Sequence, residues 1–227
     1  MKYAKILDGV FLKRPNRFIA YIEIAGREEI CHVKNTGRCK ELLIPGCKVY
    51  VEESSNPLRK TKYDLIAVKK GATLINMDSQ APNKVALEWL ENGGIKGITF
   101  IKPESTYGNS RFDFYFEKGK KKCYLEVKGV TLEDNGVVRF PDAPTERGVK
   151  HINELISATK DGFETYILFV IQMKCAKYFE PNWTTQPAFG DSLIAAKKAG
   201  VKLLAYTCTV TKSTLKIDHP VKIRLNK

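Results

Sequence analysis

The sequence predicts two domains, an all-β barrel of the OB-fold type over residues 1–80 and a mixed α/β domain over residues 81–227. Short strand-like runs without a long helix fill the first 80 residues. Strand-like and helix-like segments alternate in the remainder. The short, polar, proline-containing stretch at residues 78–82 separates these two patterns, and we place the domain boundary near residue 80.

Composition narrows the class of protein. The 227 residues carry a formal net charge of +13, which indicates a polyanionic partner such as nucleic acid; a lysine-rich protein can also be simply soluble. The six cysteines include no CxxC pair, so free thiols in a reducing cytoplasm are expected instead of a zinc site. No apolar run approaches the roughly 20 residues of a membrane span, and no signal segment opens the chain. We therefore expect a soluble cytoplasmic protein that does not enter membranes.

The barrel prediction depends on a series of short strands bounded by turn residues. OB-fold barrels of this kind present one strand face and their loops to single-stranded nucleic acid. Thr36 is a plausible cap for a short helix or turn that ends before Pro45. The expected strands are 10–14, 17–25, 28–33, 47–53, 63–69 and 72–76, and the short helix or turn is 36–43.

Basic residues gather in the loops and turns of this first domain. Phe11, Phe18 and Tyr21 lie near them in the sequence and could stack on bases, although aromatic residues in a barrel more often belong to its core. Contacts with phosphate are the functional interpretation of the basic loops, and a solvated basic surface is the alternative. The candidate nucleic-acid-binding residues here are Lys13, Arg14, Arg17, Lys34, Arg38 and Lys40.

The elements of the second domain follow from their periodicity. Asn83 is a plausible cap for the first helix and Asp142 for the second, in which Pro144 suits the first turn. The run at 165–172 is continuously apolar, which is typical of a strand buried on both faces. These elements predict a central sheet with helices on both faces. The expected helices are 82–92, 142–160 and 191–199, and the expected strands are 95–101, 111–117, 124–128, 136–140, 165–172, 201–210 and 214–225.

A hairpin within residues 108–132 is the centre of the functional prediction. Its two strands alternate with a period of two, around a charged turn at 118–122. The alternation places Phe112, Phe114 and Phe116 on one face of the first strand. If the apolar faces of the two strands share one core, Asp113, Glu126 and Lys128 share the opposite face. Arg111 falls on the face of Asp113, and we expect it to contact nucleic acid.

Two carboxylates and a lysine on one face suit metal-assisted hydrolysis of a phosphodiester. Mg²⁺ prefers oxygen ligands and keeps several waters, so Asp113 and Glu126 are sufficient to hold it at a phosphate. Lys128, two residues beyond Glu126, would orient the attacking water or offset developing negative charge. The alternative is a solvated strand face with a surface salt bridge, because a D…ExK spacing also occurs by chance.

One row of the second helix carries further candidates. Arg147, His151 and Glu154 are spaced i, i+4, i+7 and therefore lie on the same side of the helix. Arg147 could hold the scissile phosphate, and His151 could contact nucleic acid or move a proton. An ordinary polar helix face is the alternative, and for Glu154 we favour it.

Six stretches together resemble a known family. They are RPNRF at 14–18, NTGRCKELL at 35–43, GNSRFDF at 108–114, LEVKGVTL at 125–132, FPDAPTERG at 140–148 and HINEL at 151–155. The whole chain resembles the sugar fermentation stimulation protein A (SfsA) family. This resemblance implies an OB-fold amino domain joined to a restriction-endonuclease-like, PD-(D/E)xK domain. It also implies DNA binding with little sequence preference, and a regulatory link to maltose metabolism in enteric bacteria.

The resemblance also implies roles for particular residues. The nuclease motif falls on Asp113, Glu126 and Lys128, and the acid that many such nucleases carry on the preceding helix would be Glu88. The position before the motif aspartate is Phe112, where the full signature has proline.

Two functions of different classes remain open at the level of sequence. In the first, the protein is a nuclease in which Glu88, Asp113 and Glu126 hold Mg²⁺ or Mn²⁺ and Lys128 positions the water. In the second, it is a DNA-binding regulator that does not cut. Carboxylates facing phosphates would weaken pure binding by about 1 kcal/mol each, which favours the nuclease. DNA is the expected partner, and RNA is a third possibility because OB barrels bind single strands of either kind.

Overall fold

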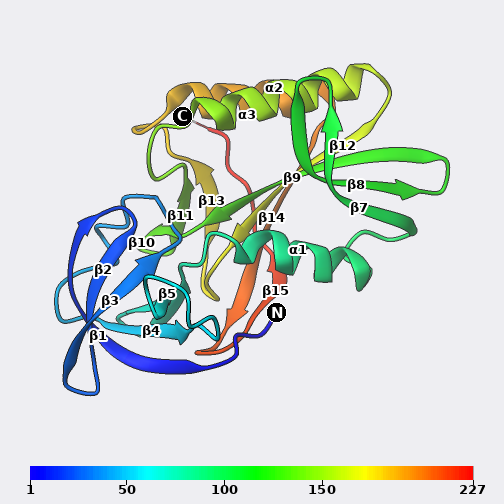
Figure 1. The fold of residues 1–227 in the computed structure, drawn as a ribbon. Coiled ribbons are helices and arrows are strands. Elements are labelled where there is room, and N and C mark those ends of the chain that lie inside the picture. Colours follow the sequence, from blue (N-terminus) through cyan, green and yellow to red (C-terminus); the bar gives the residue numbers. More distant parts are fainter. Residues whose placement is uncertain (227) are drawn as a thin grey trace.

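The computed structural model describes residues 1–226. A β-barrel built from the amino-terminal part of the chain lies beside a larger domain in which helices cover a mixed sheet (Figure 1). The amino terminus crosses to the larger domain, where Lys2 pairs with Thr214 and the Met1 carbonyl accepts a hydrogen bond from the Leu215 amide.

The barrel has the strand order of an OB fold. Its sheet runs β3-β2-β1-β4-β5-β6, and an additional parallel pairing of β3 with β5 closes the first five strands into a ring. Alternate residues of the strands point inward, among them the fully buried Ile22, Val33, Val51 and Leu65. The predicted OB-fold barrel is confirmed. The strands are β1 (Ile6–Asn16), β2 (Ile19–Ile24), β3 (Arg27–Val33), β4 (Lys48–Glu53), β5 (Tyr63–Lys70) and β6 (Thr73–Asn76).

The segment 36–43, expected as a short helix or turn, forms a turn between β3 and β4. Cys39 has a left-handed backbone with φ 47°, a conformation that does not fit an α-helix. The segment therefore belongs to the loop surface of the barrel.

A six-stranded sheet of order β15-β14-β12-β9-β8-β7 forms the centre of the second domain. The middle strands β9, β12 and β14 run parallel, whereas both edges are antiparallel. As predicted from its apolar run, β12 is buried on both faces. The strands are β7 (Ile98–Tyr107), β8 (Ser110–Lys118), β9 (Lys121–Val130), β12 (Glu164–Ile171), β14 (Lys202–Val210) and β15 (Leu215–Pro220).

A second, three-stranded sheet lies beside the first and contains two strands that the sequence analysis missed. It consists of β10 (Leu132–Asp134), β11 (Val137–Phe140) and β13 (Tyr178–Pro181). The missed strands are β10 and β13, which are only three and four residues long, so their patterns are too short to identify.

Three helices cover the two faces of the central sheet. α1 (Ala81–Glu91) packs into one apolar cluster with Phe114 and Leu125, while α2 (Glu146–Lys160) and α3 (Pro187–Ala199) pack into the cluster on the other face. The predicted arrangement of helices on both faces is therefore present. None of the helices within residues 1–226 is long and apolar enough to cross a membrane.

Both predicted helix caps are wrong. α1 begins after Gln80, which makes no side-chain cap bond, and Asn83 lies inside the helix. α2 is capped by Thr145, whose hydroxyl accepts from the Gly148 amide 3.0 Å away. Asp142 precedes that cap by three residues and lies in a loop between β11 and α2.

Candidate active site

The paired strands β8 and β9 bring the two predicted acids together. The last paired residues of the two strands are Phe114 and Leu125. Asp113 and Glu126 are the next residues on their strands, so the regular register places them opposite each other. The prediction that Phe112 shares a face with Phe114 and Phe116 is wrong, because Phe112 packs in the other core cluster against the ring of Tyr124, 5.1 Å away.

Asp113 is held by two donors. One carboxylate oxygen accepts from the Val127 backbone amide at 2.7 Å, and the other accepts from Nδ2 of Asn83 at 2.7 Å. Burial raises the pKa of Asp113, and the neighbouring charge of Glu126 raises it further. The donors from Val127 and Asn83 oppose these effects without cancelling them. The Asp113 carboxylate is thus fixed in orientation, but its ionised form destabilises the folded protein.

Glu126 is 2 % exposed, and its two carboxylate oxygens differ in their hydrogen bonds. Its Oε1 accepts from Lys128 Nζ at 2.6 Å and from Nδ1 of His151. Its Oε2 is buried and has no hydrogen-bond partner within residues 1–226. Burial by itself raises the pKa of Glu126, but the hydrogen bond with His151 and the charge of Lys128 outweigh it and lower the pKa below its usual value. The carboxylate is therefore held ionised, with one oxygen free.

Arg147 donates a hydrogen bond to His151, which in turn bonds to Glu126. Arg147 Nε donates to His151 Nε2 at 3.2 Å, and a guanidinium nitrogen can only donate. Nε2 is therefore the acceptor, and the proton of a neutral His151 sits on Nδ1, where it points at Glu126. His151 is buried and so cannot lie against nucleic acid as predicted, whereas Arg147 is exposed in the first turn of α2.

These residues fit a divalent cation. Asp113 and Glu126 supply hard oxygen ligands near each other, since the charge of Glu126 acts on Asp113, and a cation would satisfy the free Oε2 of Glu126. Lys128 lies beside them with its side chain 15 % exposed. Within the described part of the chain, no group of three acidic, histidine or cysteine side chains surrounds this point, so waters and a bound phosphate would complete the coordination.

Glu88 does not belong to this group, and its prediction as a metal ligand is not supported by its position. Its carboxylate forms an ion pair of 2.5 Å with the amino terminus of Met1. Asn83 is the residue of α1 that reaches Asp113. Five residues along a helix turn the side chain by about 140°, so Glu88 points away from the side that carries Asn83.

Arg14, predicted to bind phosphate, instead holds two loops of the barrel together. Its guanidinium donates to the carbonyls of Gly37, Arg38, Arg17 and Asn35 at 2.7–3.1 Å. These bonds occupy both of its terminal nitrogens. The side chain thus supports the fold of the 35–38 loop, and its phosphate contact stays a prediction.

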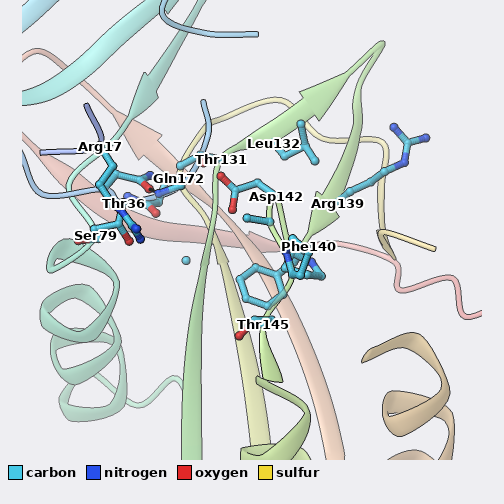
Figure 2. Close-up of a pocket in the computed structure, with 16 residues that line it drawn as sticks. Arg17, Thr36, Ser79, Thr131, Leu132, Arg139, Phe140, Asp142, Thr145 and Gln172 are labelled. Carbon is cyan, nitrogen blue, oxygen red and sulfur yellow. Dashed lines mark hydrogen bonds between the residues drawn. The ribbon is translucent and has the colours of Figure 1, made fainter. Parts of the chain in front are cut away.

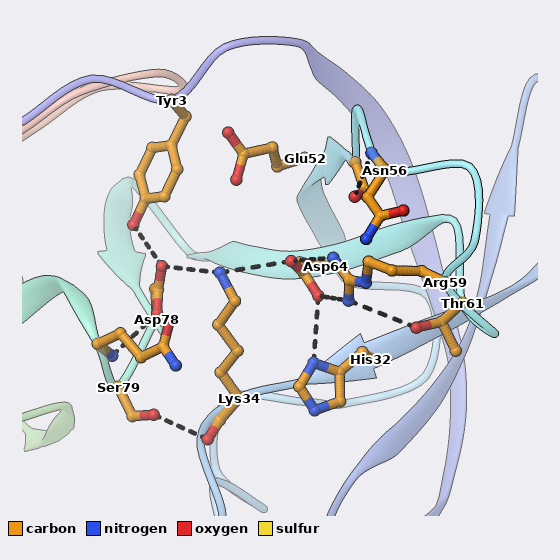
Figure 3. Close-up of polar contacts among 12 residues, drawn as sticks. Tyr3, His32, Lys34, Glu52, Asn56, Arg59, Thr61, Asp64, Asp78 and Ser79 are labelled. Carbon is orange, nitrogen blue, oxygen red and sulfur yellow. Dashed lines mark hydrogen bonds and ion pairs between the residues drawn. The ribbon is translucent and has the colours of Figure 1, made fainter.

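Lys34 is likewise occupied within the protein. Figure 3 shows its ammonium between the carboxylates of Asp64 and Asp78, at 3.4 and 3.2 Å. Arg59 and His32 also bind Asp64, and the hydroxyl of Ser79 donates to the Lys34 carbonyl. Lys34 therefore connects the barrel to the segment that leads into α1, and its phosphate contact stays a prediction.

The remaining basic candidates are available at the surface. Lys13, Arg17, Arg38 and Lys40 are exposed and line one open groove of about 460 Å³ on the barrel. Arg111 is also exposed and lies 3.3 Å from Glu104.

Sequence reasoning missed a cavity of about 360 Å³ between the barrel and the second domain (Figure 2). Its walls come from the barrel loop at 35–37, the carboxyl end of β9 and the loop that leads into α2. The sequence held a signal for it, because the stretches at 35–43 and 140–148 carried the family resemblance without receiving a shared role.

Comparison with known proteins matches the whole architecture. Residues 12–77 match the family model of the SfsA N-terminal OB domain, and residues 80–214 match that of the sugar fermentation stimulation protein RE domain. A sugar fermentation stimulation protein homolog of Desulfitobacterium hafniense is 60 % identical over 225 residues, which cover 99 % of each chain. A homolog of Clostridium beijerinckii is 58 % identical over 99 % of this chain and 100 % of its own.

A solved structure agrees with these matches. The structure of Pyrococcus furiosus SfsA in complex with Ca²⁺ superimposes with a TM-score of 0.90 at 27 % identity, over 99 % of this chain and 98 % of that one. Both domain matches, the full-length relatives and the shared fold lead to one conclusion: the chain belongs to the sugar fermentation stimulation protein (SfsA) family.

Proposed function

We propose that the protein is a metal-dependent nuclease that hydrolyses phosphodiester bonds in nucleic acid, with DNA as the expected substrate. The observation that carries this proposal is the free, buried Oε2 of Glu126, which stands opposite Asp113 and beside Lys128. An unsatisfied buried carboxylate oxygen destabilises a fold, and a bound cation removes that cost.

Mg²⁺ or Mn²⁺ is the expected cofactor, held by Asp113 and Glu126. The P. furiosus relative is described as a Ca²⁺ complex, and Ca²⁺ prefers the same hard oxygen ligands. When bound, such a cation stabilises charge on a phosphoryl group and lowers the pKa of a bound water.

The residues of the chain supply the remaining parts of the reaction. The Lys128 ammonium, paired to Glu126 in the free protein, offsets negative charge on the attacking water and the phosphate. Arg147 presents the guanidinium nitrogens that do not bind His151 to a second phosphate oxygen. His151 is a positioning residue, because it fixes Glu126 and stays buried.

The barrel supplies the binding surface. Lys13, Arg17, Arg38 and Lys40 are exposed around one groove, and neutralising phosphates with such residues gives affinity without sequence preference. This surface would hold the strand while the second domain cuts it.

A DNA-binding protein that does not cut is the second candidate. It is favoured by the position of Glu88, which leaves two carboxylates at the site where many related nucleases have three. Against it stand Asp113 and Glu126 themselves, since carboxylates facing phosphates weaken simple binding.

The experiment is incubation of the purified protein with labelled single- and double-stranded DNA and RNA, in Mg²⁺, Mn²⁺ or EDTA. Lys128→Met is compared with Lys122→Met, which removes an exposed lysine of the same strand. We expect metal-dependent cutting that Lys128→Met abolishes and Lys122→Met preserves.

Binding without cutting, equal in EDTA and in metal and unaffected by Glu126→Gln, would overturn the nuclease. That outcome would leave the non-catalytic binding protein.

A further inference from the structure

The cavity between the two domains has the form of a site for one nucleotide. It encloses about 360 Å³, within the range of pockets that take small organic ligands and too small for a duplex. Gly129 and Thr131 form one wall, and they follow Lys128 directly along the chain. At about 3.3 Å per residue, Thr131 lies about 10 Å from Lys128, so a strand cut at Lys128 passes the mouth of the cavity.

Gln172 presents a fixed hydrogen-bond acceptor to this cavity. Its side-chain nitrogen donates to the Asn76 side chain at 2.8 Å and to the Asp78 carbonyl at 3.0 Å. The orientation of the amide is thereby set, and Oε1 points toward Gly129, where a Cβ would lie only 2.6 Å away. Gln172 is 2 % exposed, and no donor within residues 1–226 reaches its Oε1. An acceptor that faces a cavity without a protein partner can take a hydrogen bond from a ligand that brings a donor.

Asp142 supplies a second acceptor from the opposite wall, as Figure 2 shows. Its carboxylate lies against the barrel loop, since a Cβ on Gly37 would be 2.0 Å from Oδ2. No lysine or arginine of the described chain forms an ion pair with it. A carboxylate that faces a cavity repels phosphate and attracts N–H groups.

The rest of the lining suits a flat ring with a phosphate at its edge. Phe140, Leu132 and Pro141 contribute apolar surface, and the half-buried Phe140 ring faces the cavity. Arg17 stands exposed at the rim, where a phosphate of the same nucleotide would lie.

We propose that this cavity binds a single nucleobase of the substrate strand, extruded from its neighbours, and that it prefers bases with an amino group. Guanine matches best, because its N1–H and N2–H₂ donors face the two oxygens of Asp142. Cytosine and adenine offer one amino group each, and thymine offers none. The proposal rests on nucleic acid as the substrate and gives the binding step a base preference that the phosphate contacts cannot supply.

The test is an NMR titration of the ¹⁵N-labelled full chain with dGMP, dCMP, dAMP and dTMP, in EDTA so that cutting plays no part. We expect the amides of Gly129 and Thr131 and the side-chain amide of Gln172 to shift. Binding of dTMP should be about tenfold weaker than that of dGMP, the loss expected when a charge-assisted hydrogen bond is missing. In Asp142→Asn the preference for dGMP should disappear.

Asp134→Asn is the matched control, because it removes the same charge from the exposed end of β10, outside the cavity, and should leave the preference unchanged. Equal binding of dTMP and dGMP would overturn the base preference. Unmoved signals at Gly129, Thr131 and Gln172 with all four nucleotides would overturn the site itself. The cutting assay with Lys128→Met is read separately, so nuclease activity can stand when the cavity proposal fails.

Discussion

Asp113 accepts a hydrogen bond from the backbone amide of Val127 at 2.7 Å, just where the ladder between β8 and β9 ends. The side chain thus takes the place of a strand carbonyl, and the hairpin opens on the face where Glu126 stands. The same contact places the Asp113 carboxylate in a partly buried position beside another carboxylate. This position links the chemistry of the site to the stability of the fold.

Replacing Asp113 with Asn should stabilise the metal-free protein at pH 7 while abolishing cutting. The pKa of Asp113 is raised in the folded state by burial and by Glu126, so the ionised form destabilises the fold. That destabilisation is present above the folded pKa and disappears below the unfolded value of about 3.9. We expect Asp113→Asn to raise Tm by about 2–4 °C, the effect of 1 kcal/mol in a chain of this length.

Thermal unfolding in EDTA between pH 4 and 8 measures this effect. The difference in Tm between Asp113→Asn and the native protein should shrink toward pH 4, where Asp113 becomes protonated. Asp134→Asn, at the exposed end of β10, should show no such difference. A lower Tm for Asp113→Asn at pH 7 would mean that the bonds to Val127 and Asn83 outweigh the cost of the charge.

Replacing His151 with Ala should reduce cutting and shift its pH dependence. Burial raises the pKa of Glu126, and the hydrogen bond with His151 is the first of the interactions that lower it. Without His151 the pKa of Glu126 rises, and the acidic limb of the pH–rate profile moves to higher pH. We expect a loss of roughly 10–100-fold, as is typical when a group that orients a metal ligand is removed.

His151→Gln should recover part of the rate, because its amide can also donate to Glu126. His219→Ala removes an exposed histidine of β15 and should change nothing. An unshifted pH profile in His151→Ala would show that His151 does not set the ionisation of Glu126.

The elements of both domains were predictable because their hydrophobic patterns are local. The alternation in β8 and the continuous apolar run of β12 appear directly in the sequence. The pairing of Phe114 with Leu125, next to Asp113 and Glu126, also followed, since a hairpin fixes the register of its strands. The packing of Phe112 against Tyr107 and Tyr124 involves residues outside its own strand, which a local pattern does not contain.

The predicted side chains that the structure occupies with other partners share one physical reason. Arg14 and Lys34 looked like phosphate ligands because charge in a loop is visible in the sequence, whereas the partners that occupy the charge are not. Glu88 was separated from the site by a helical rotation and by the position of Met1, 87 residues away. Contacts between distant segments thus decided which charges are free.

A divalent cation should stabilise the native protein through Glu126 and leave Glu126→Gln unaffected. Ligand at one hundred times its Kd adds about 2.7 kcal/mol, or roughly 5–10 °C in Tm. The comparison is the shift that Mg²⁺, Mn²⁺ or Ca²⁺ produces within each variant in thermal unfolding. Glu88→Gln is the control, because Glu88 binds the amino terminus and its replacement should preserve the shift. Loss of the cation-induced Tm shift in Glu88→Gln would mean that Glu88 contributes to metal binding.

Arg14 and Arg17 should respond differently to replacement by Ala. Arg14 donates to four loop carbonyls, so its loss should destabilise the protein by about 2–3 kcal/mol in urea unfolding. Arg17 is exposed, so its loss should leave stability unchanged and reduce the salt slope of single-strand binding by about 0.7. An unchanged salt slope in Arg17→Ala would mean that this side chain does not contact the nucleic acid.

The ion-pair network of Asp64 should make the barrel sensitive to acid. Burial raises the pKa of Asp64, but the hydrogen bonds from Arg59 and the charge of Lys34 outweigh it and lower the pKa to about 2 (Figure 3). A lowered carboxylate pKa stabilises the fold above the unfolded value of about 3.9, and this stabilisation is lost as the pH falls through 2. We expect the free energy of unfolding to drop by an amount on the order of 2 kcal/mol over that window. Asp64→Asn should be less stable at pH 7 and should lack this step, as measured by urea unfolding at pH 2–7. The control is Glu53→Gln. Glu53 lies on β4 and forms ion pairs with Lys5 and Lys62, outside the network of Asp64. An acid step that survives in Asp64→Asn would assign it to carboxylates outside this network.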